Sequence, residues 1–164
     1  MNESLESWTT IRQLLEYELW CNRLALNFVS GLSSEEQQRD FGFGLRTPHH
    51  TVFHIVNVMR TWSACVAPVI QKPDPLPYRR DQPLEEIGRA LEEVGRGWLE
   101  AATASHKLGV LNMERRLHQL FHLVTHGTHH RGQLLSMVTL LGGYEQPFEG
   151  GDFGGWSNNG AGSK

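Results

Sequence analysis

The sequence predicts an all-α protein, a four-helix bundle in one domain. Apolar residues recur at spacings of three and four in four long segments, and no stretch of useful length alternates apolar and polar residues as a strand does. The chain has 164 residues, of which 39% are hydrophobic and 20% charged, a composition typical of a soluble globular protein. We expect the bundle over residues 1–146 and a glycine-rich tail over residues 147–164.

The first predicted helix extends from Ser4 to about Ser30 and ends at Gly31, a residue common just after helix ends. Its apolar face comprises Leu5, Trp8, Ile11, Leu15, Leu19, Leu26 and Val29. In the connector that follows, Ser33 and Glu36 have the spacing of a capping box, which predicts a short helical turn.

The second predicted helix begins at Thr47-Pro48, because threonine caps free N–H groups and proline lacks the donor that the first turn leaves unsatisfied. It should end at about Ala67. Residues 68–83 then include five prolines, which exclude regular structure and predict a stiff crossover between helices two and three. A crossover of this length can join helices that run parallel.

The third predicted helix covers residues from Pro83 to about His106, and the fourth extends from about Asn112 to Leu141. The core face of the fourth helix should comprise Leu117, Leu120, Leu123, Val124, Leu134, Leu135, Met137, Val138 and Leu141. Eight glycines follow within residues 142–164, which predicts an extended tail.

Histidine is the unusual residue, since eight of nine histidines fall in residues 49–54 and 118–130. On a helical wheel, His126 and His130 lie at or beside the core face of the fourth helix, and their i,i+4 spacing lets two imidazoles converge on one ion. His50 or His54 of the second helix can supply a third ligand, and His54 lies nearer the apolar face. Three histidines from two helices leave coordination positions open, as in catalytic metal sites. The alternative is an ordinary polar helix face.

Other residues near this cluster have open roles. Arg131 falls near the core, so we expect a carboxylate partner, Glu16 or Glu18, or else a substrate anion. The glycines beside the pair, Gly127 and Gly132, either make room for a ligand or allow close helix packing. Asp152 is either a further ligand or a solvated loop acid. Together with His50 and His122, Arg131 and Asp152 are the candidates to orient the metal ligands.

Several classes of function are disfavoured. The net charge is −3 with no concentrated basic cluster, so we expect no nucleic-acid partner. No apolar run approaches the length of a membrane span, and the acidic N-terminal segment does not resemble a secretory signal, which predicts a cytoplasmic protein without a membrane partner. Cys21 and Cys65 form no disulfide framework or metal knuckle, and we expect both to be buried.

Two segments, TPHHTVFHIVNVMRTW and HLVTHGTHHRGQLLSMVTLLG, with the later Pro147 and Asp152, resemble the DinB-like family, which includes the YfiT-like thiol transferases. The resemblance covers most of the chain. It implies an up-down-down-up bundle, often a homodimer, in which three histidines bind one divalent ion such as nickel, zinc or iron. The ligands that it implies are His54, His126 and His130.

The resemblance also implies a function. We expect a metal-dependent thiol S-transferase or related small-molecule enzyme acting in stress or detoxification, with a low-molecular-weight thiol and a small electrophile as partners. Metal-dependent hydrolysis is a variant of this hypothesis. Two alternatives are a non-catalytic metal-binding stress-response protein and a helical interaction module without metal.

Overall fold

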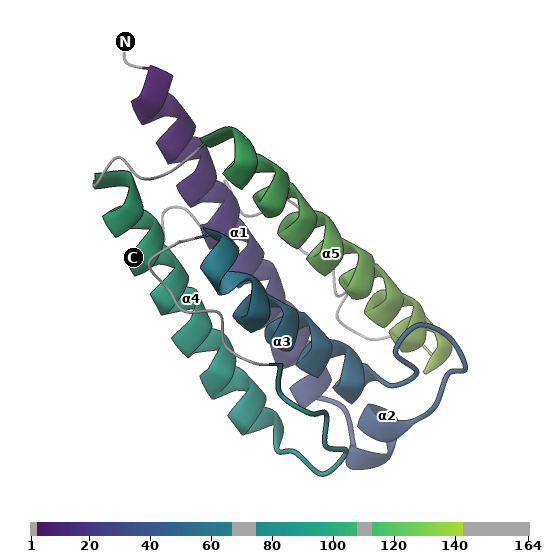
Figure 1. The fold of residues 1–164 in the computed structure, drawn as a ribbon. Helices are drawn as coiled ribbons and strands as arrows, with labels where there is room; N and C mark the ends of the chain where they lie inside the picture. The colour runs from purple at the N-terminus through teal and green to yellow at the C-terminus, as the bar shows by residue number, and fades with distance from the viewer. Residues whose placement is uncertain (1–2, 67–74, 108–112, 143–164) are drawn as a thin grey trace.

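The computed structural model describes residues 3–66, 75–107 and 113–142, and these ranges contain five α-helices and no strand. The predicted all-α class is therefore confirmed for this part of the chain (Figure 1). The glycine-rich tail over residues 147–164, with Pro147 and Asp152, lies outside the described residues.

The four long helices are α1 (Glu3–Ser30), α3 (Pro48–Val66), α4 (Leu84–Lys107) and α5 (Met113–Leu140). Each end lies within one residue of the position that the sequence predicts. A capping hydrogen bond explains why α3 begins at Pro48: the Thr47 hydroxyl accepts the backbone N–H of His50 at 3.0 Å.

A fifth, short helix, α2 (Ser34–Gln38), occupies the connector between α1 and α3. The predicted capping box is present: the Ser33 hydroxyl accepts the Glu36 N–H at 3.3 Å, and the Glu36 carboxylate accepts the Ser33 N–H at 2.8 Å. The connector then turns through Gly42, Gly44 and Arg46, all with positive φ. Two of these are glycines, which adopt this conformation without a steric penalty.

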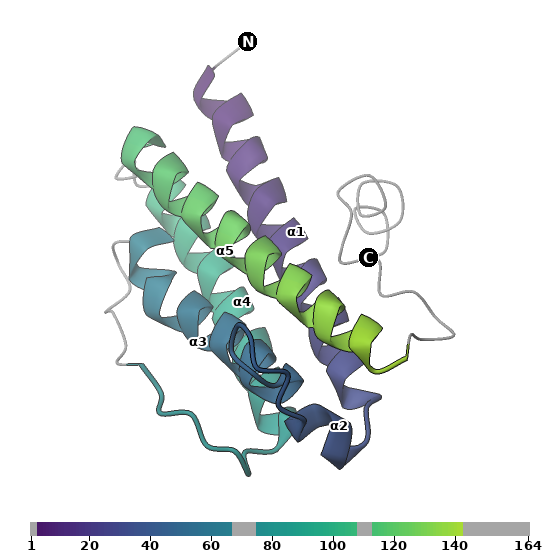
Figure 2. The same cartoon turned by 90° about the vertical axis from the view of Figure 1, so that its right-hand side faces the viewer.

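Helices α1 and α5 start at one end of the molecule, and α3 and α4 start at the other (Figures 1 and 2). Helices α1 and α3 each pack against both α4 and α5, and they also contact each other. The contact between α3 and α5 is the most extensive in the described structure. These are the two helices that carry the histidine clusters, so the fold brings the clusters together.

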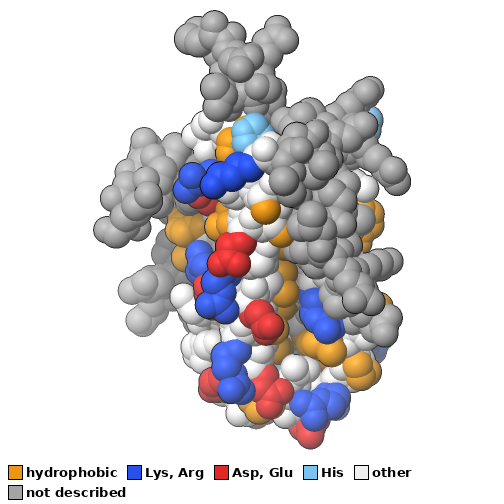
Figure 3. Space-filling model, turned by 60° about the vertical axis from the view of Figure 1, so that its left-hand side comes forward, with side chains coloured by type: hydrophobic (Ala, Val, Ile, Leu, Met, Phe, Trp, Pro, Cys, Tyr) orange, Lys and Arg blue, Asp and Glu red, His pale blue; other side chains and the backbone are white. Residues whose placement is uncertain are grey.

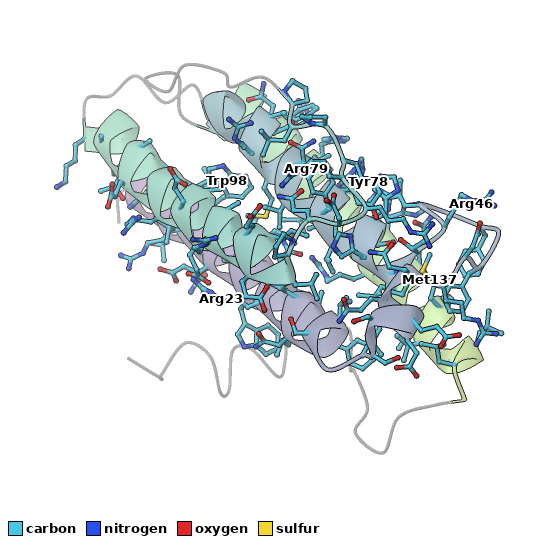
Figure 4. The ribbon with its side chains drawn as sticks, turned by 90° about the horizontal axis from the view of Figure 1, so that it is seen from below. Arg23, Arg46, Tyr78, Arg79, Trp98 and Met137 are labelled. Carbon is cyan, nitrogen blue, oxygen red and sulfur yellow. The ribbon has the colours of Figure 1, made fainter. Side chains whose placement is uncertain are left out.

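The core lies between the four long helices. Trp98 points from α4 into the bundle and is fully buried (Figure 4). The sequence places Leu135 in this core, and that prediction is wrong, because 40% of its side chain is exposed. It lies at the solvent edge of the wide apolar face of α5. The apolar side chains contributed by α3 and α5 include Val52, Phe53, Ile55, Val56, Met59, Leu123, Leu134 and Val138.

A buried ion pair joins α5 to α1. Arg131 donates through Nη1 to Oε1 of Glu18 at 2.9 Å and through Nη2 to Oε2 at 3.2 Å, and both side chains are 2% exposed. Asn22 completes the group, since its Oδ1 accepts from Arg131 at 2.6 Å. Of the two expected carboxylates, Glu18 is thus the partner, whereas Glu16 pairs with Arg12.

The described part of the crossover, residues 75–83, is fastened along α3. Asn57 both donates to the carbonyl of Leu76 at 3.0 Å and accepts its N–H at 2.9 Å. Tyr78 stacks on His50, with ring centroids 3.9 Å apart, and lies beside α3 in Figure 4. The buried His49 donates from Nε2 to the carbonyl of Gln82 at 2.7 Å.

The surface of the described residues fits the charge pattern of the sequence. Acidic and basic side chains are interspersed on the face shown in Figure 3. Arg23 and Glu92, for example, join α1 to α4 through two hydrogen bonds of 2.6 Å. Among the described helices, none is both long and apolar enough to span a membrane.

Candidate metal centre

Three histidines converge between α3 and α5. The Nε2 atoms of His54 and His126 lie 3.1 Å apart, and the His130 ring centroid lies 4.6 Å from that of His54 and 4.4 Å from that of His126. One nitrogen from each ring lies within 4.8 Å of a nitrogen from each of the others. All three side chains are half-buried, so the cluster lies near the surface of the bundle.

Helix geometry explains this convergence. His126 and His130 are one turn apart on α5 and project from the same face. His54 lies on α3, which packs along α5, so its ring meets both of the others. The three residues that the family resemblance implies as ligands are therefore brought together, whereas His50 is not part of the cluster.

The distances suit a divalent ion. At metal–nitrogen distances of about 2.0–2.1 Å, two ligand nitrogens lie about 2.9 Å apart at right angles and about 3.3 Å apart in a tetrahedral site. The 3.1 Å between Nε2 of His54 and Nε2 of His126 falls between these values. A hydrogen bond between two imidazoles also has this length. Such a bond between His54 and His126 does not explain why the ring of His130 lies close to both of them. Three imidazole nitrogens suit zinc, nickel or iron and leave positions open for other ligands.

The electrostatic environment keeps these histidines neutral. Burial, followed by the neighbouring imidazoles, lowers the pKa of His54 and of His126 to about 4. Burial also lowers the pKa of His130. A neutral imidazole has a lone pair that can bind a metal, and an imidazolium does not, so the ligand atoms are available at neutral pH.

The two other candidate histidines, His50 and His122, are not part of the cluster. Nδ1 of His50 donates to the carbonyl of Leu45 at 3.1 Å, and its ring stacks on Tyr78, so this residue fastens the connector and the crossover to α3. His122 is exposed; its ring lies 4.3 Å from that of Trp62 and 5.7 Å from that of His126. Of His50 and His122, His122 is therefore the one whose ring lies beside that of a candidate ligand, His126.

Arg131, another candidate to orient the ligands, lies away from the three histidines. Arg131 is engaged with Glu18, Asn22 and Thr128 in the core. Gly127 packs directly against this ion pair. A Cβ at that position would lie 1.9 Å from Oε1 of Glu18. Close packing is thus the reason for this glycine. Asp152 lies outside the described residues.

One residue at the centre was missed from the sequence. Gln133 accepts a hydrogen bond from Nδ1 of His130 at 2.9 Å and contacts His129 through its amide nitrogen, also at 2.9 Å. The available signal was its i,i+3 spacing from His130, which places the two side chains on neighbouring positions of one helix face. The spacing alone does not distinguish a contact with His130 from a solvated glutamine.

Comparison with known proteins identifies a family for this chain. The family model that matches the chain is that of the DinB family, over residues 1–160. Among curated proteins and among solved structures, no match was found. Because the family match covers nearly the whole chain, the protein belongs to the DinB family.

Proposed function

We propose that His54, His126 and His130 bind one divalent ion and that the protein is a metal-dependent thiol S-transferase acting on small electrophiles. The observation that supports this proposal most directly is the convergence of three neutral imidazoles from two helices, with two Nε2 atoms 3.1 Å apart. When bound, such an ion favours the thiolate form of a coordinated thiol. The thiolate sulfur then bonds to the electrophilic carbon, and the leaving group departs with the electron pair and takes up the proton.

The charge around the centre favours an anionic reactant. Three neutral histidines do not compensate the charge of a divalent ion, and neither residues 48–66 nor residues 115–142 contain an Asp or Glu. The buried carboxylate of Glu18 is paired with Arg131, and the exposed carboxylate of Asp40 is paired with Arg46. A thiolate or another small anion would supply the missing negative charge at the open positions.

The thiol in this proposal is a separate low-molecular-weight molecule and not Cys21. Cys21 is buried, as the sequence predicts, and burial raises the pKa of its thiol to about 11. It therefore stays protonated at neutral pH and does not serve as a nucleophile. A low-molecular-weight thiol reaches the half-buried histidines more easily than this core residue does.

We further propose that the helices form the up-down-down-up bundle of the family and that two copies associate. The helix directions in Figure 1 support the first statement. The exposed apolar side chains of α5, Phe121, Leu135 and Leu140, support the second. Sedimentation at micromolar concentrations tests it: a dimer is expected, and a single monomer species over that range contradicts it.

Metal content of untagged protein is the first test. We expect about one equivalent of a divalent metal in the wild type, by analogy with single three-histidine centres, and almost none in His126→Ala. His118→Ala is the matched control, because His118 is an exposed histidine of the same helix and should leave the metal content unchanged. Equal, substoichiometric metal in all three proteins contradicts the proposal.

Turnover of thiol and electrophile is the second test. We expect the electrophile to be consumed only when both the thiol and the metal are present. His126→Ala should not consume it. Turnover that needs metal but no thiol would instead indicate a hydrolase, with water at the open positions. A metal-loaded protein without either activity would favour a non-catalytic metal-binding protein.

A further inference from the structure

The side chain of Gln133 links two histidines of α5. Its Oε1 accepts a hydrogen bond from Nδ1 of His130, and its Nε2 lies within hydrogen-bond distance of Nε2 of His129. A carboxamide oxygen has no proton to donate, so Nδ1 of His130 must carry the proton in this contact. In the neutral ring, Nε2 of His130 is then unprotonated and has a lone pair.

This choice of tautomer matters for the candidate metal centre. If Gln133 were turned around, its NH₂ group would donate to Nδ1 of His130, and the ring would carry its proton on Nε2 instead. One tautomer presents a lone pair at Nε2 and the other does not. The orientation of one carboxamide therefore decides which nitrogen of His130 can serve as the ligand atom.

The connector between α2 and α3 packs directly against this carboxamide. A Cβ built on Gly44 would lie 2.7 Å from Oε1 and 2.8 Å from Cδ of Gln133, closer than real Cβ contacts. The connector is itself ordered by hydrogen bonds: the Asp40 carboxylate accepts the N–H of Gly42 at 2.8 Å and the Nε–H of Arg46 at 2.9 Å. Gly44 thus sets a fixed backbone surface beside the Gln133 side chain.

We propose that Gln133 is the positioning residue of the metal centre: held between Gly44 and His129, it fixes the ring orientation and the tautomer of His130. The inference rests on the proposed metal site for its consequence, but the tautomer itself is a property of the metal-free protein. Hydrogen-bond partners of this kind raise the affinity of a metal site by about 10–100-fold.

The first measurement uses no metal. Nitrogen chemical shifts of the imidazole rings in metal-free protein at pH 7 report which nitrogen is protonated. We expect His130 of the wild type to be protonated on Nδ1, and Gln133→Leu, which keeps the side-chain bulk and removes the acceptor, to show a mixture of tautomers. Gln133→Glu keeps an acceptor oxygen and should restore the wild-type tautomer. Protonation on Nε2 in the wild type would overturn the proposal.

The second measurement is the affinity for Co²⁺, followed by the absorption of the bound ion, which also reports ligand geometry. We expect Gln133→Leu to bind about 10–100-fold more weakly and Gln133→Glu to bind like the wild type. An unchanged affinity and spectrum in Gln133→Leu would overturn the proposal. A wild type that has His130 protonated on Nδ1 but binds no Co²⁺ would support the positioning of His130 by Gln133 and contradict the proposed metal function. A failure of this inference and a failure of the proposed function are therefore distinguishable.

The backbone contact has a matched control in the same connector. Gly44 and Gly42 both have positive φ, at 54° and 77°, so alanine strains the backbone at either position. Only at Gly44 does the added methyl group meet Gln133, since no described atom lies within 4 Å of a Cβ at Gly42. Gly44→Ala should weaken Co²⁺ binding about tenfold, and Gly42→Ala should leave it unchanged. Equal effects would exclude the contact with Gln133 as the cause.

Discussion

Replacing Gly127 with alanine adds one methyl group where α5 passes the buried ion pair of α1. The new Cβ would lie 1.9 Å from Oε1 of Glu18 and 2.6 Å from Nη1 of Arg131. Neither side chain can swing aside easily. Glu18 and Arg131 hydrogen-bond each other and Asn22, and both are only 2% exposed. The carboxylate and the guanidinium must therefore separate, or α5 must move away from α1.

The expected loss of stability follows from two opposing effects. Alanine in place of glycine within a helix stabilises the protein by about 1 kcal/mol. Disrupting a buried ion pair costs about 3–5 kcal/mol. The net loss in the free energy of unfolding should be about 2–4 kcal/mol, which lowers Tm by about 5–15 °C for a chain of this size.

The control is Gly132→Ala, five residues along the same helix. No described atom lies within 4 Å of a Cβ at this exposed position, so only the helical preference of alanine acts. Its Tm should rise by about 2–4 °C. Thermal unfolding followed by circular dichroism measures both variants. A Gly127→Ala protein as stable as Gly132→Ala would refute the argument from the ion pair.

The other predictions concern the helix start, the crossover and pH. Thr47→Ala removes the hydroxyl that accepts the His50 N–H in the first turn of α3, and urea unfolding should show a loss of about 1 kcal/mol; an unchanged midpoint would contradict this. Asn57→Ala removes both hydrogen bonds between Asn57 and the crossover, so limited proteolysis should cut residues 75–83 several times faster, while equal rates would show that the contacts of Tyr78 and Gln82 suffice to hold the segment. Because His54 and His126 have a pKa of about 4 when folded and about 6.5 when unfolded, the unfolded chain binds more protons between these values. Metal-free protein should therefore lose stability as the pH falls from about 6.5 to about 4, and chelator-treated wild type that is equally stable to urea at pH 7 and pH 5 would contradict this.

The helices could be predicted from the sequence because local signals define their ends. The signals for the starts of α3 and α2 lie within one helical turn: Thr47-Pro48 for α3 and the capping box of Ser33 and Glu36 for α2. The spacing of apolar residues extends over whole helices. The wheel also placed His126 and His130 toward the bundle, where the structure brings them together with His54. Periodicity was less accurate at the edge of a face, as the exposed Leu135 shows, because the angular width of a buried face depends on its neighbours.

Contacts between distant segments could not be predicted in the same way. Nothing in the local sequence pairs Gly44 with Gln133, or Asn57 with Leu76, because these contacts depend on how the connector and the crossover return to the helices. The sequence leaves Glu16, Glu18 or a substrate anion as the partner of Arg131, and only the packing of α1 on α5 selects Glu18. Spacing within a helix identifies which residues share a face, and tertiary packing decides what that face meets.

The position of Arg131 directly after His130 has a consequence for how α5 is oriented about its own axis. Successive side chains of a helix point about 100° apart, so one residue faces α3 and its neighbour faces α1. Apolar contacts are non-directional and allow a helix to swivel slightly, whereas the hydrogen bonds of Arg131 to Glu18 and Asn22 are satisfied at one rotation only. Helix α1 contributes no histidine to the cluster, yet through this ion pair it limits the direction in which His130 points.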